Sequence, residues 1–466
     1  MLRSALATLT LLTLPFAAFA QDSAGPSRVP RERVTRVVDS IAHDAIGRQV
    51  LAGMVVIATR GPDTLLAGAY GSAEPENDVR MTVAHVFQLA SITKQFTAAA
   101  VLTLVQDGRV GLDEPIRRYL PDAPIQGRAI TVRQLLSHTA GIPDYAESPR
   151  IGALKRLDLP PDSFVALVAT TPFYFEPGEQ MRYSNTGYAL LGQLIERVSG
   201  QPYATYVEQR VLRPAGAVHA HFCDLQAMVK HLARGYTATP DGIRPASYLS
   251  PNAPYAAGGF CGTAGDLAAW NAALHARRGG PVLAPALYAE MVKPGTVAGG
   301  RRTRYGFGVA LSDISGRPAV HHGGDIDGFT TFTAYLPADS LNLTVLLNTQ
   351  GPTRPDAIAA AVVEAALGPR PRPAAGAGPR DLTIFAGRYD DDVTITPVEG
   401  GTGKLRLERG PLPPAELSYA GRSGSGWIFT DGRARYTFEP PVQGSSSSPA
   451  VWADLVVSLV RWERAP

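Results

Sequence analysis

Cysteine and lysine are both scarce in this sequence. Cys223 and Cys261 are the only cysteines among the 466 residues, which excludes a small scaffold held together by disulfides. The sequence leaves open whether they form one bridge in an oxidising compartment or stay as two buried thiols. Only five lysines stand among the 44 Lys and Arg residues, so arginine supplies nearly all the positive charge. A lysine inside an apolar segment of this chain is therefore poorly explained as a surface charge.

The sequence also has no excess of one charge, no repeat and no long apolar run beyond residue 20. Its formal net charge is +3, which is too balanced to indicate a nucleic-acid partner or an anionic membrane surface. The 47 Gly and 39 Pro follow no Gly-X-Y period, which excludes collagen. Hydrophobic residues make up 45% of the chain, enough for a large core, and the length predicts two or three domains.

Residues 1–20 have the pattern of a secretory signal. Arg3 precedes an apolar run over residues 6–19, and Ala-Phe-Ala at 18–20 resembles a cleavage site. The run contains Pro15 and is shorter than the roughly 20 residues of a membrane span. We therefore expect export, most simply to a periplasm, and a mature protein without a membrane-spanning segment.

The rest of the chain divides by composition. Residues 21–32 are expected to form a flexible tail, and residues 33–367 mix helical and strand patterns. Residues 368–381 are rich in Pro, Gly and Ala, as in a semi-rigid linker. Short alternating apolar runs separated by turn residues fill 382–466, which is typical of a small all-β barrel.

In the large domain, strands are expected first and last, with helices between them. Strand pairs are predicted at 54–58 with 64–70 and at 330–336 with 341–347. Helices are predicted over 91–107, 188–199 and 266–275, with a capping box at Thr131-Val-Arg-Gln134. The sequence therefore predicts an α+β fold: an antiparallel sheet flanked by helices, with an inserted helical subdomain.

Ser91-Ile-Thr-Lys94 opens the apolar helix at 91–107. Residues i and i+3 share a helix face, so the Lys94 amine can reach the Ser91 hydroxyl. A serine is a poor nucleophile until a base takes its proton, and a buried lysine can be that base, whereas arginine cannot. The helix N-terminus also offers N–H donors to an oxyanion. The alternative is that Ser91 caps the helix while Lys94 extends to solvent.

Two further segments carry polar groups suited to a substrate. In Tyr183-Ser-Asn185, a phenol can relay a proton and an amide can bind a carbonyl. Taken alone, this segment is better explained by Asn185 as a helix cap and Tyr183 as a packing residue. In His322-Gly-Gly324-Asp325, the glycines let a ligand lie against a strand edge. The His322 ring can offer a donor or a cation.

The three motifs, in this order, resemble the serine β-lactamase and penicillin-binding-protein superfamily, particularly its class C, D-Ala-D-Ala peptidase and esterase branch. The family pattern is Ser-x-x-Lys, then Tyr-x-Asn, then Lys or His-x-Gly. The likeness covers about residues 33–367 and includes Leu135-Leu-Ser-His-Thr-Ala-Gly141. The C-terminal domain is similar to the lipocalin-like appendage of some members.

The resemblance implies a role for each motif residue. Ser91 would be the acylated nucleophile, Lys94 its activating neighbour and Tyr183 a proton relay. Asn185 would hold the substrate amide, and His322 with Gly324 would line the opposite strand. The N–H groups of Ser91 and Asp325 would form the oxyanion hole, and no cofactor or metal is implied.

One position departs from the β-lactamase branch, which usually has Lys-Thr-Gly at the third motif. His322 replaces that lysine and is largely neutral at pH 7 unless its pKa is shifted. This replacement favours a peptidase or esterase over an efficient β-lactamase. We therefore predict a secreted serine hydrolase acting on a small amide or ester.

Several competing interpretations are weaker. His219-Ala-His221-Phe-Cys223-Asp224 has spacing that suits a metal, but no distant pair completes a binuclear site. No Gly-x-Ser-x-Gly occurs, which argues against an α/β-hydrolase. Ser137 and His138 are adjacent on a short helix and face different directions. A different class of function is a non-catalytic protein that binds peptidoglycan or lipid on the same scaffold. The sequence does not indicate an oligomeric state.

Overall fold

A computed structural model gives the fold of the chain. It describes residues 31–224 and 227–368 and, beyond these, residue 379 and the segments 381–389, 393–398, 403–409, 412–423, 426–430, 435–439, 450–454 and 459–463. The expected signal and most of the tail and linker lie outside these residues. The first helix, α1 (Arg31–Gly47), begins inside the segment expected as a tail.

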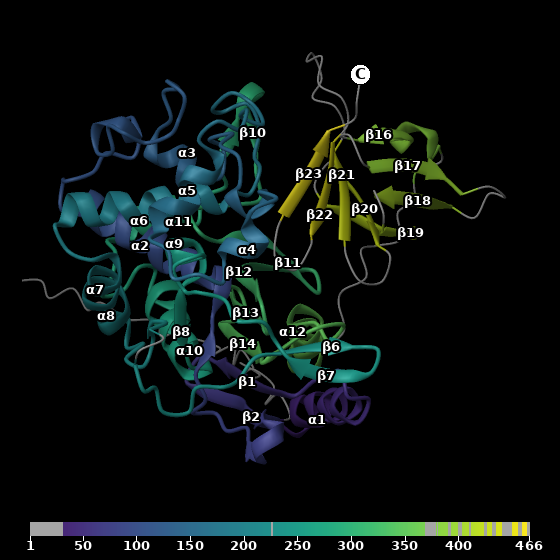
Figure 1. Cartoon of the computed structure of the whole chain (residues 1–466). Helices are drawn as coiled ribbons and strands as arrows, with labels where there is room; N and C mark the ends of the chain where they lie inside the picture. Colours follow the sequence, from purple (N-terminus) through teal and green to yellow (C-terminus); the bar gives the residue numbers. More distant parts are fainter. Residues whose placement is uncertain are drawn as a thin grey trace, which may run out of the picture.

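A seven-stranded antiparallel sheet forms the centre of the large domain, in the order β11-β12-β13-β14-β1-β2-β3 (Figure 1). The strands from the two ends of the domain meet in the middle, where β1 pairs with β14. The predicted strand pairs are therefore confirmed, each within a few residues. The bounds are β1 (Gly53–Arg60), β2 (Asp63–Glu74), β3 (Val79–Arg80), β11 (Ala310–Ile314), β12 (Arg317–Ile326), β13 (Phe329–Leu336) and β14 (Leu341–Leu347).

Helices cover both faces of this sheet. One face packs on α1 and α12 (Pro355–Leu367), whose apolar side chains form one core with alternate residues of the sheet. The other face packs on α10 (Ala264–Asn271) and on a helical subdomain between β3 and β11. In that subdomain α2 (Thr93–Gln106) packs against α6 (Asn185–Ser199). The antiparallel sheet flanked by helices, with a helical insertion, is therefore confirmed.

The remaining helices of the large domain are short. The capping box that opens α3 is present as predicted, with Thr131 and Gln134 each bonding the backbone of the other. The short helices are α3 (Val132–Leu136), α4 (Ile151–Leu154), α5 (Pro161–Val165), α7 (Tyr203–Val207), α8 (Arg213–Ala215), α9 (Tyr255–Gly258) and α11 (Pro285–Met291).

Three small sheets complete the large domain. In the sheet β4-β8-β5, strand β4 ends at Gln88, shortly before Ser91 in sequence. The strands are β4 (Phe87–Gln88), β5 (His221–Phe222), β8 (Phe260–Gly262), β6 (Tyr236–Thr239), β7 (Gly242–Pro245), β15 (Thr349–Gln350), β9 (Thr296–Val297) and β10 (Arg301–Arg302).

Beyond residue 381, the described residues form β-strands, as expected, apart from a 3-10 turn at Thr383–Phe385. Eight strands follow one another in a single antiparallel sheet, each paired with the next along the chain. The apolar run at 455–460 also predicts a strand, but residues 455–458 lie outside the described residues. The strands are β16 (Gly387–Tyr389), β17 (Val393–Pro397), β18 (Lys404–Arg409), β19 (Leu412–Ser423), β20 (Gly426–Thr430), β21 (Arg435–Glu439), β22 (Ala450–Asp454) and β23 (Leu459–Glu463).

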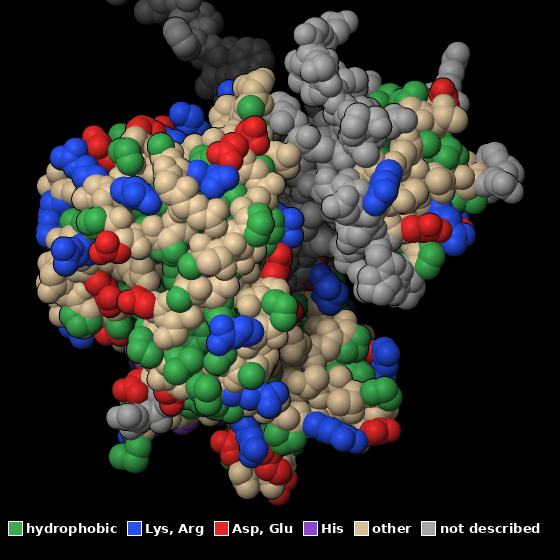
Figure 2. All heavy atoms as spheres, turned by 45° about the horizontal axis from the view of Figure 1, so that its top comes forward, with side chains coloured by type: hydrophobic (Ala, Val, Ile, Leu, Met, Phe, Trp, Pro, Cys, Tyr) green, Lys and Arg blue, Asp and Glu red, His purple; other side chains and the backbone are tan. Residues whose placement is uncertain are grey.

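The surface carries charges of both signs. Basic and acidic side chains alternate over the face in Figure 2, in keeping with the small net charge of the sequence. Within the described residues, no helix combines the length and apolarity that crossing a bilayer requires.

Candidate active site

Ser91 lies in a tight turn at the start of a buried helix. The turn η2 (Ala90–Ile92) leads directly into α2, whose side chains from Thr93 to Leu104 are all buried. Ala90 has φ 50°, a left-handed conformation that costs free energy for a residue with a side chain. The turn is held from the sheet side by Thr331 Oγ1, which donates to the Leu89 carbonyl at 3.0 Å. The backbone therefore presents Ser91 in a strained, fixed position.

Lys94 is fully buried and contacts three oxygen atoms. Its Nζ lies 3.2 Å from Ser91 Oγ, 2.8 Å from Asn185 Oδ1 and 2.8 Å from the carbonyl oxygen of Ala257. Nζ also lies 4.6 Å from the centre of the Tyr183 ring. Lys94 therefore joins the first two sequence motifs at one point. The alternative in which it extends to solvent is excluded.

Burial makes Lys94 a base near neutral pH. Removal from water lowers the pKa of the Lys94 amine to about 7, against a weaker opposing effect of the Asp144 carboxylate. Burial likewise raises the pKa of the Tyr183 phenol, which stays protonated at neutral pH. Of these two candidate bases, Lys94 is the one that loses its proton in the working range.

Tyr183 and Asn185 lie beside Lys94, at the start of α6. Ser184 caps this helix through its side chain, so Asn185 is the first helical residue and Tyr183 lies just outside. The Tyr183 hydroxyl is buried and makes no hydrogen bond with the described residues, although the nearby Ser91 hydroxyl favours its ionised form. It is therefore free to exchange a proton with a reacting group.

His138 packs behind Tyr183 and does not pair with Ser137. Its ring centre lies 4.3 Å from that of Tyr183 and 4.7 Å from that of Tyr305, and its Nδ1 accepts from the Ser184 N–H at 3.2 Å. Ser137 Oγ instead donates to the Arg133 carbonyl. The structural interpretation of His138 is confirmed, and its ring fixes one face of Tyr183.

Strand β12 brings the third motif to the nucleophile turn. Strand β11 pairs with β12 only as far as His321, so the edge from His322 onward has no β11 partner. A Cβ atom added to Gly324 would lie 2.4 Å from the Leu89 carbonyl oxygen and 2.9 Å from Ala90 Cβ. Only a glycine lets the strand approach this closely. The three motifs therefore converge around Ser91.

His322 is neutral, so of the two roles that its sequence allows, hydrogen-bond donor or cation, the cation is excluded. His322 is 2% exposed, and burial, with Lys94 nearby, lowers the pKa of its imidazole to about 3. Its Nδ1 lies 2.6 Å from the Gly323 carbonyl oxygen and therefore donates, while its Nε2 accepts from the Tyr305 hydroxyl at 2.8 Å. Both nitrogens are committed, so His322 shapes the strand and supplies no positive charge.

Asp325 follows on the same strand. Its carboxylate is exposed and accepts from Gln350 Nε2 at 2.6 Å, so the side chain is engaged outside the Ser91 turn. At the next turn, Asp327 forms an ion pair with Lys155, with an Nζ–Oδ2 distance of 2.7 Å. This pair joins the segment after α4 to the strand that carries the third motif.

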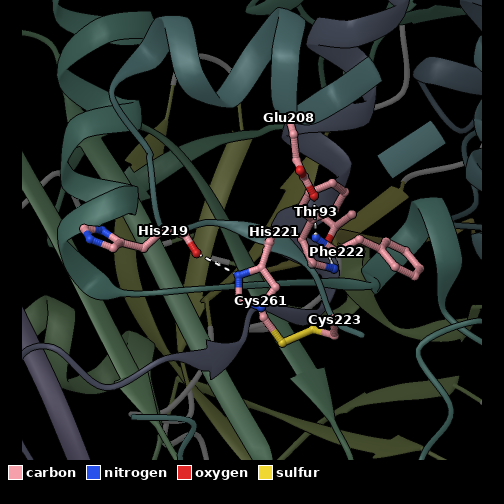
Figure 3. The surroundings of a disulfide bond; sticks show 8 residues. Thr93, Glu208, His219, His221, Phe222, Cys223 and Cys261 are labelled. Carbon is pink, nitrogen blue, oxygen red and sulfur yellow. Dashed lines mark hydrogen bonds between the residues drawn. A yellow bond between two sulfur atoms is a disulfide. The ribbon is translucent and has the colours of Figure 1, made fainter. Parts of the chain in front are cut away.

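His219, His221 and Cys223, which the sequence suggested as metal ligands, make structural contacts instead. Cys223 is bonded to Cys261 with a Cα–Cα distance of 5.2 Å, which removes the thiolate from the set. Figure 3 shows the His219 ring turned away from His221, whose Nδ1 lies 2.8 Å from the His219 carbonyl oxygen. Within the described residues, no three His, Cys, Asp or Glu side chains form a metal-binding group.

The disulfide cross-links the small sheet β4-β8-β5, which adjoins the turn that carries Ser91. It joins the end of β5 to β8, and β8 in turn pairs with β4. Phe260 of β8 accepts from the Leu89 N–H at 2.8 Å and donates its own N–H to Thr93 Oγ1 at 3.1 Å. The bridge, which the sequence left open, therefore supports the residues on both sides of Ser91.

Sequence reasoning missed one buried acid. Asp144 is 6% exposed, and its Oδ2 accepts from the Asn185 N–H at 3.1 Å and from Asn185 Nδ2 at 2.9 Å. The available signal was Pro143-Asp144 directly after the family-like segment that ends at Gly141, a sequence typical of a turn or cap.

A serine beside a buried lysine of lowered pKa, a free phenol and an open strand edge define a serine hydrolase of the acyl-transfer type. The chain belongs to the Beta-lactamase family, whose model matches residues 35–367.

The relatives agree with this class. "Penicillin-binding protein 4*" of Bacillus subtilis (strain 168) is 30% identical over 226 residues, which are 44% of this chain and 48% of that protein. The D-amino acid amidase from Ochrobactrum anthropi SV3 is 27% identical with a TM-score of 0.61, covering 71% of this chain and 98% of the amidase. An octameric penicillin-binding protein homologue from Pyrococcus abyssi shares the fold over 92% of this chain and 99% of its own, with a TM-score of 0.65 and 24% identity.

Proposed function

We propose that this protein is a secreted serine hydrolase that cleaves a small amide or ester through an acyl-enzyme on Ser91. The observation that carries the proposal is the position of Lys94 Nζ, 3.2 Å from Ser91 Oγ in a buried site. Its pKa of about 7 makes the free amine available at neutral pH.

The reaction proceeds in two halves. Lys94 takes the Ser91 proton while Oγ bonds to the substrate carbonyl carbon, and the carbonyl electron pair moves onto its oxygen. The oxyanion collapses and the bond to the leaving group breaks. That group receives the proton that Lys94 took from Ser91, relayed through Tyr183, and Lys94 returns to its neutral form. Water then adds to the acyl ester with its proton passing to Lys94, and the same collapse returns the proton to Ser91.

The oxyanion would bind between the nucleophile turn and β12. The N–H groups of Ser91 and Asp325 are the proposed donors. The close approach of β12 at Gly324 supports this assignment, because it brings the strand edge beside the turn at Leu89 and Ala90.

The third motif supports a substrate without a carboxylate beside the cleaved bond. His322 is neutral and bonded to Tyr305, and Gly323 has no hydroxyl group. A neutral amide or ester therefore fits this side better than a penicillin or a peptide with a free C-terminal carboxylate. The D-amino acid amidase among the relatives supports the amide as one substrate class.

Export is proposed from the first 20 residues of the sequence. The Cys223–Cys261 disulfide supports it, because such bonds persist in oxidising compartments.

The test is intact-mass spectrometry of the protein with an activated short-chain ester, D-phenylalanine p-nitroanilide or a penicillin. Wild-type protein should gain one acyl group and Ser91→Ala none, while Ser163→Ala, which removes another hydroxyl from the same domain, should behave like wild type. We expect turnover of the ester or anilide to exceed turnover of the penicillin. If none of the three acylates the wild-type protein, the non-catalytic binding protein replaces this proposal.

A further inference from the structure

Asp144 is a buried carboxylate next to the proposed catalytic groups, and none of the three family motifs includes it. Its Oδ2 accepts two hydrogen bonds from Asn185, through the N–H and Nδ2, and its Oδ1 accepts from the Ala146 N–H at 3.0 Å. A carboxylate that is 6% exposed requires such partners. It lies at the N-terminus of α6, where the helix dipole favours a negative charge.

This arrangement fixes which end of the Asn185 amide faces Lys94. An ionised carboxylate only accepts hydrogen bonds, so the amide must turn Nδ2 toward Asp144. Its Oδ1 is then directed to Lys94 Nζ at 2.8 Å.

The direction of the amide decides where the lone pair of neutral Lys94 points. Neutral lysine has two N–H groups and one lone pair. Asn185 Oδ1 and the Ala257 carbonyl oxygen cannot donate, so they take the two N–H groups. The remaining hydrogen-bond contact of Nζ is with Ser91 Oγ, whose O–H then donates to the lone pair. With a reversed amide, Nδ2 would compete for that lone pair.

We propose that Asp144 is a positioning residue, which orients the Asn185 amide so that the free base of Lys94 is aimed at the Ser91 hydroxyl. This inference rests on the proposed function. It assigns to the Gly141-Ile-Pro-Asp144 turn a part in the proton transfer, beyond shaping the site.

The charge of Asp144 adds a second, measurable effect. Among the groups around Lys94, burial lowers the pKa of His138 and His322 and raises the pKa of Tyr183 and Tyr188, so all four are uncharged near pH 7. The charged neighbour is Asp144, which favours protonated Lys94 and so raises its pKa.

The surroundings of Asp144 also carry charge. Burial raises the pKa of the Asp144 carboxyl, and Glu147 adds to this effect. The N–H groups of Ala146 and Asn185 and the Lys94 amine oppose it by favouring the ionised form. Glu147 is itself held by Arg182 and by the Tyr174 hydroxyl, and Tyr145 and Tyr183 are neutral phenols nearby. Replacement of Asp144 therefore removes the negative charge next to Asn185 and leaves the outer Glu147–Arg182 pair in place.

The test is the pH dependence of kcat/KM for Asp144→Asn, which has nearly the same shape. Only deprotonated Lys94 accepts the Ser91 proton, so activity rises with pH through the Lys94 pKa. Loss of the negative charge lowers that pKa, and the acid limb should move down by roughly one pH unit. The plateau of kcat should fall about 10-fold, because the amide is no longer fixed.

Asp162→Asn is the matched control. Asp162 also accepts from a side-chain amide, Gln193 Nε2 at 2.6 Å, but the pair is exposed and does not adjoin Lys94. The acid limb of kcat/KM and the plateau of kcat of Asp162→Asn should equal those of the wild-type protein. If Asp144→Asn fails to fold, Asp144→Ser replaces it, because the hydroxyl keeps an acceptor and removes the charge.

A double-mutant cycle with Asn185→Ala shows whether Asp144 acts through the amide. The kcat of Asp144→Asn/Asn185→Ala should match that of Asn185→Ala within about twofold, since the second change has nothing left to orient. Additive losses, or an acid limb at or above that of wild type, would overturn the inference. Absence of acylation of wild-type Ser91 instead contradicts the proposed function, so the two failures are distinguishable.

Discussion

The two sides of the Ser91 site differ in charge. On the helical side, Lys94 and Asp144 place opposite charges in a buried setting, with the Asn185 amide between them. On the strand side, His322 is neutral and the next two residues are glycines. The proposed function therefore assigns proton transfer to the helical side, and backbone contacts and shape to the strand side.

The two sides also depend on different supports. The helical side is supported by the small sheet β4-β8-β5, in which the Cys223–Cys261 disulfide links β8 to the end of β5. The strand side is part of the seven-stranded sheet, where β12 pairs with β13 over its whole active-site stretch. Changes on the two sides should therefore affect the reaction in different ways.

The largest loss of kcat/KM is expected when Lys94, the buried amine of the helical side, is replaced. Lys94→Arg keeps a cation that cannot lose its proton, and Lys94→Met removes the base altogether. Both should lower kcat/KM for the ester at least about 10³-fold. Lys293→Met, at an exposed lysine paired with Glu290, should have no effect. Activity of Lys94→Arg within tenfold of wild type would contradict the assignment of Lys94 as the base.

The second largest effect is expected from disturbing the close contact between β12 at Gly324 and the turn that carries Ser91. A methyl group on Gly324 would meet Thr331 Oγ1 at 2.2 Å and push β12 from the nucleophile turn. We expect Gly324→Ala to lower kcat about 100-fold and stability by about 1–3 kcal/mol. Gly47→Ala, where nothing lies within 4 Å of the added carbon, should leave kcat unchanged. Equal kcat of both variants in steady-state assays would show that the reaction does not need the close approach of β12 to the Ser91 turn.

Much of this site could be predicted from the sequence, because its motifs are local. The Ser91–Lys94 contact follows from helix geometry alone, and strand pairs such as β1 and β2 follow from apolar runs around a turn. The order of the three motifs along the chain then identified the superfamily. These features need no knowledge of distant contacts.

The rest depends on contacts between distant segments. Asp144 acquires its role from Asn185, 41 positions later, and the His322 ring is neutral because of how Tyr305 and the core enclose it. The disulfide required a distance between β5 and β8 that spacing does not give.

The neutral strand side should respond to a new charge with a change of selectivity. His322→Lys restores the cation of the β-lactamase branch, and the ratio of kcat/KM for penicillin to that for a neutral ester should rise about 10-fold. His219→Lys changes an exposed histidine in the same way and should leave the ratio unchanged. An unchanged ratio in a His322→Lys protein that still forms the ester acyl-enzyme would separate His322 from carboxylate selection.

The smallest effect on activity, with a clear effect on stability, is expected from the disulfide. The bond closes a loop across 38 positions, and Cys223→Ser/Cys261→Ser should lower the free energy of unfolding by about 2–4 kcal/mol. In the folded protein, β8 still bonds Leu89 and Thr93 through its backbone, so kcat at 20 °C should change less than about threefold. Urea unfolding and ester turnover measured on the same sample would check both. A large loss of kcat with unchanged stability would mean that the bond sets the geometry of the helical side directly.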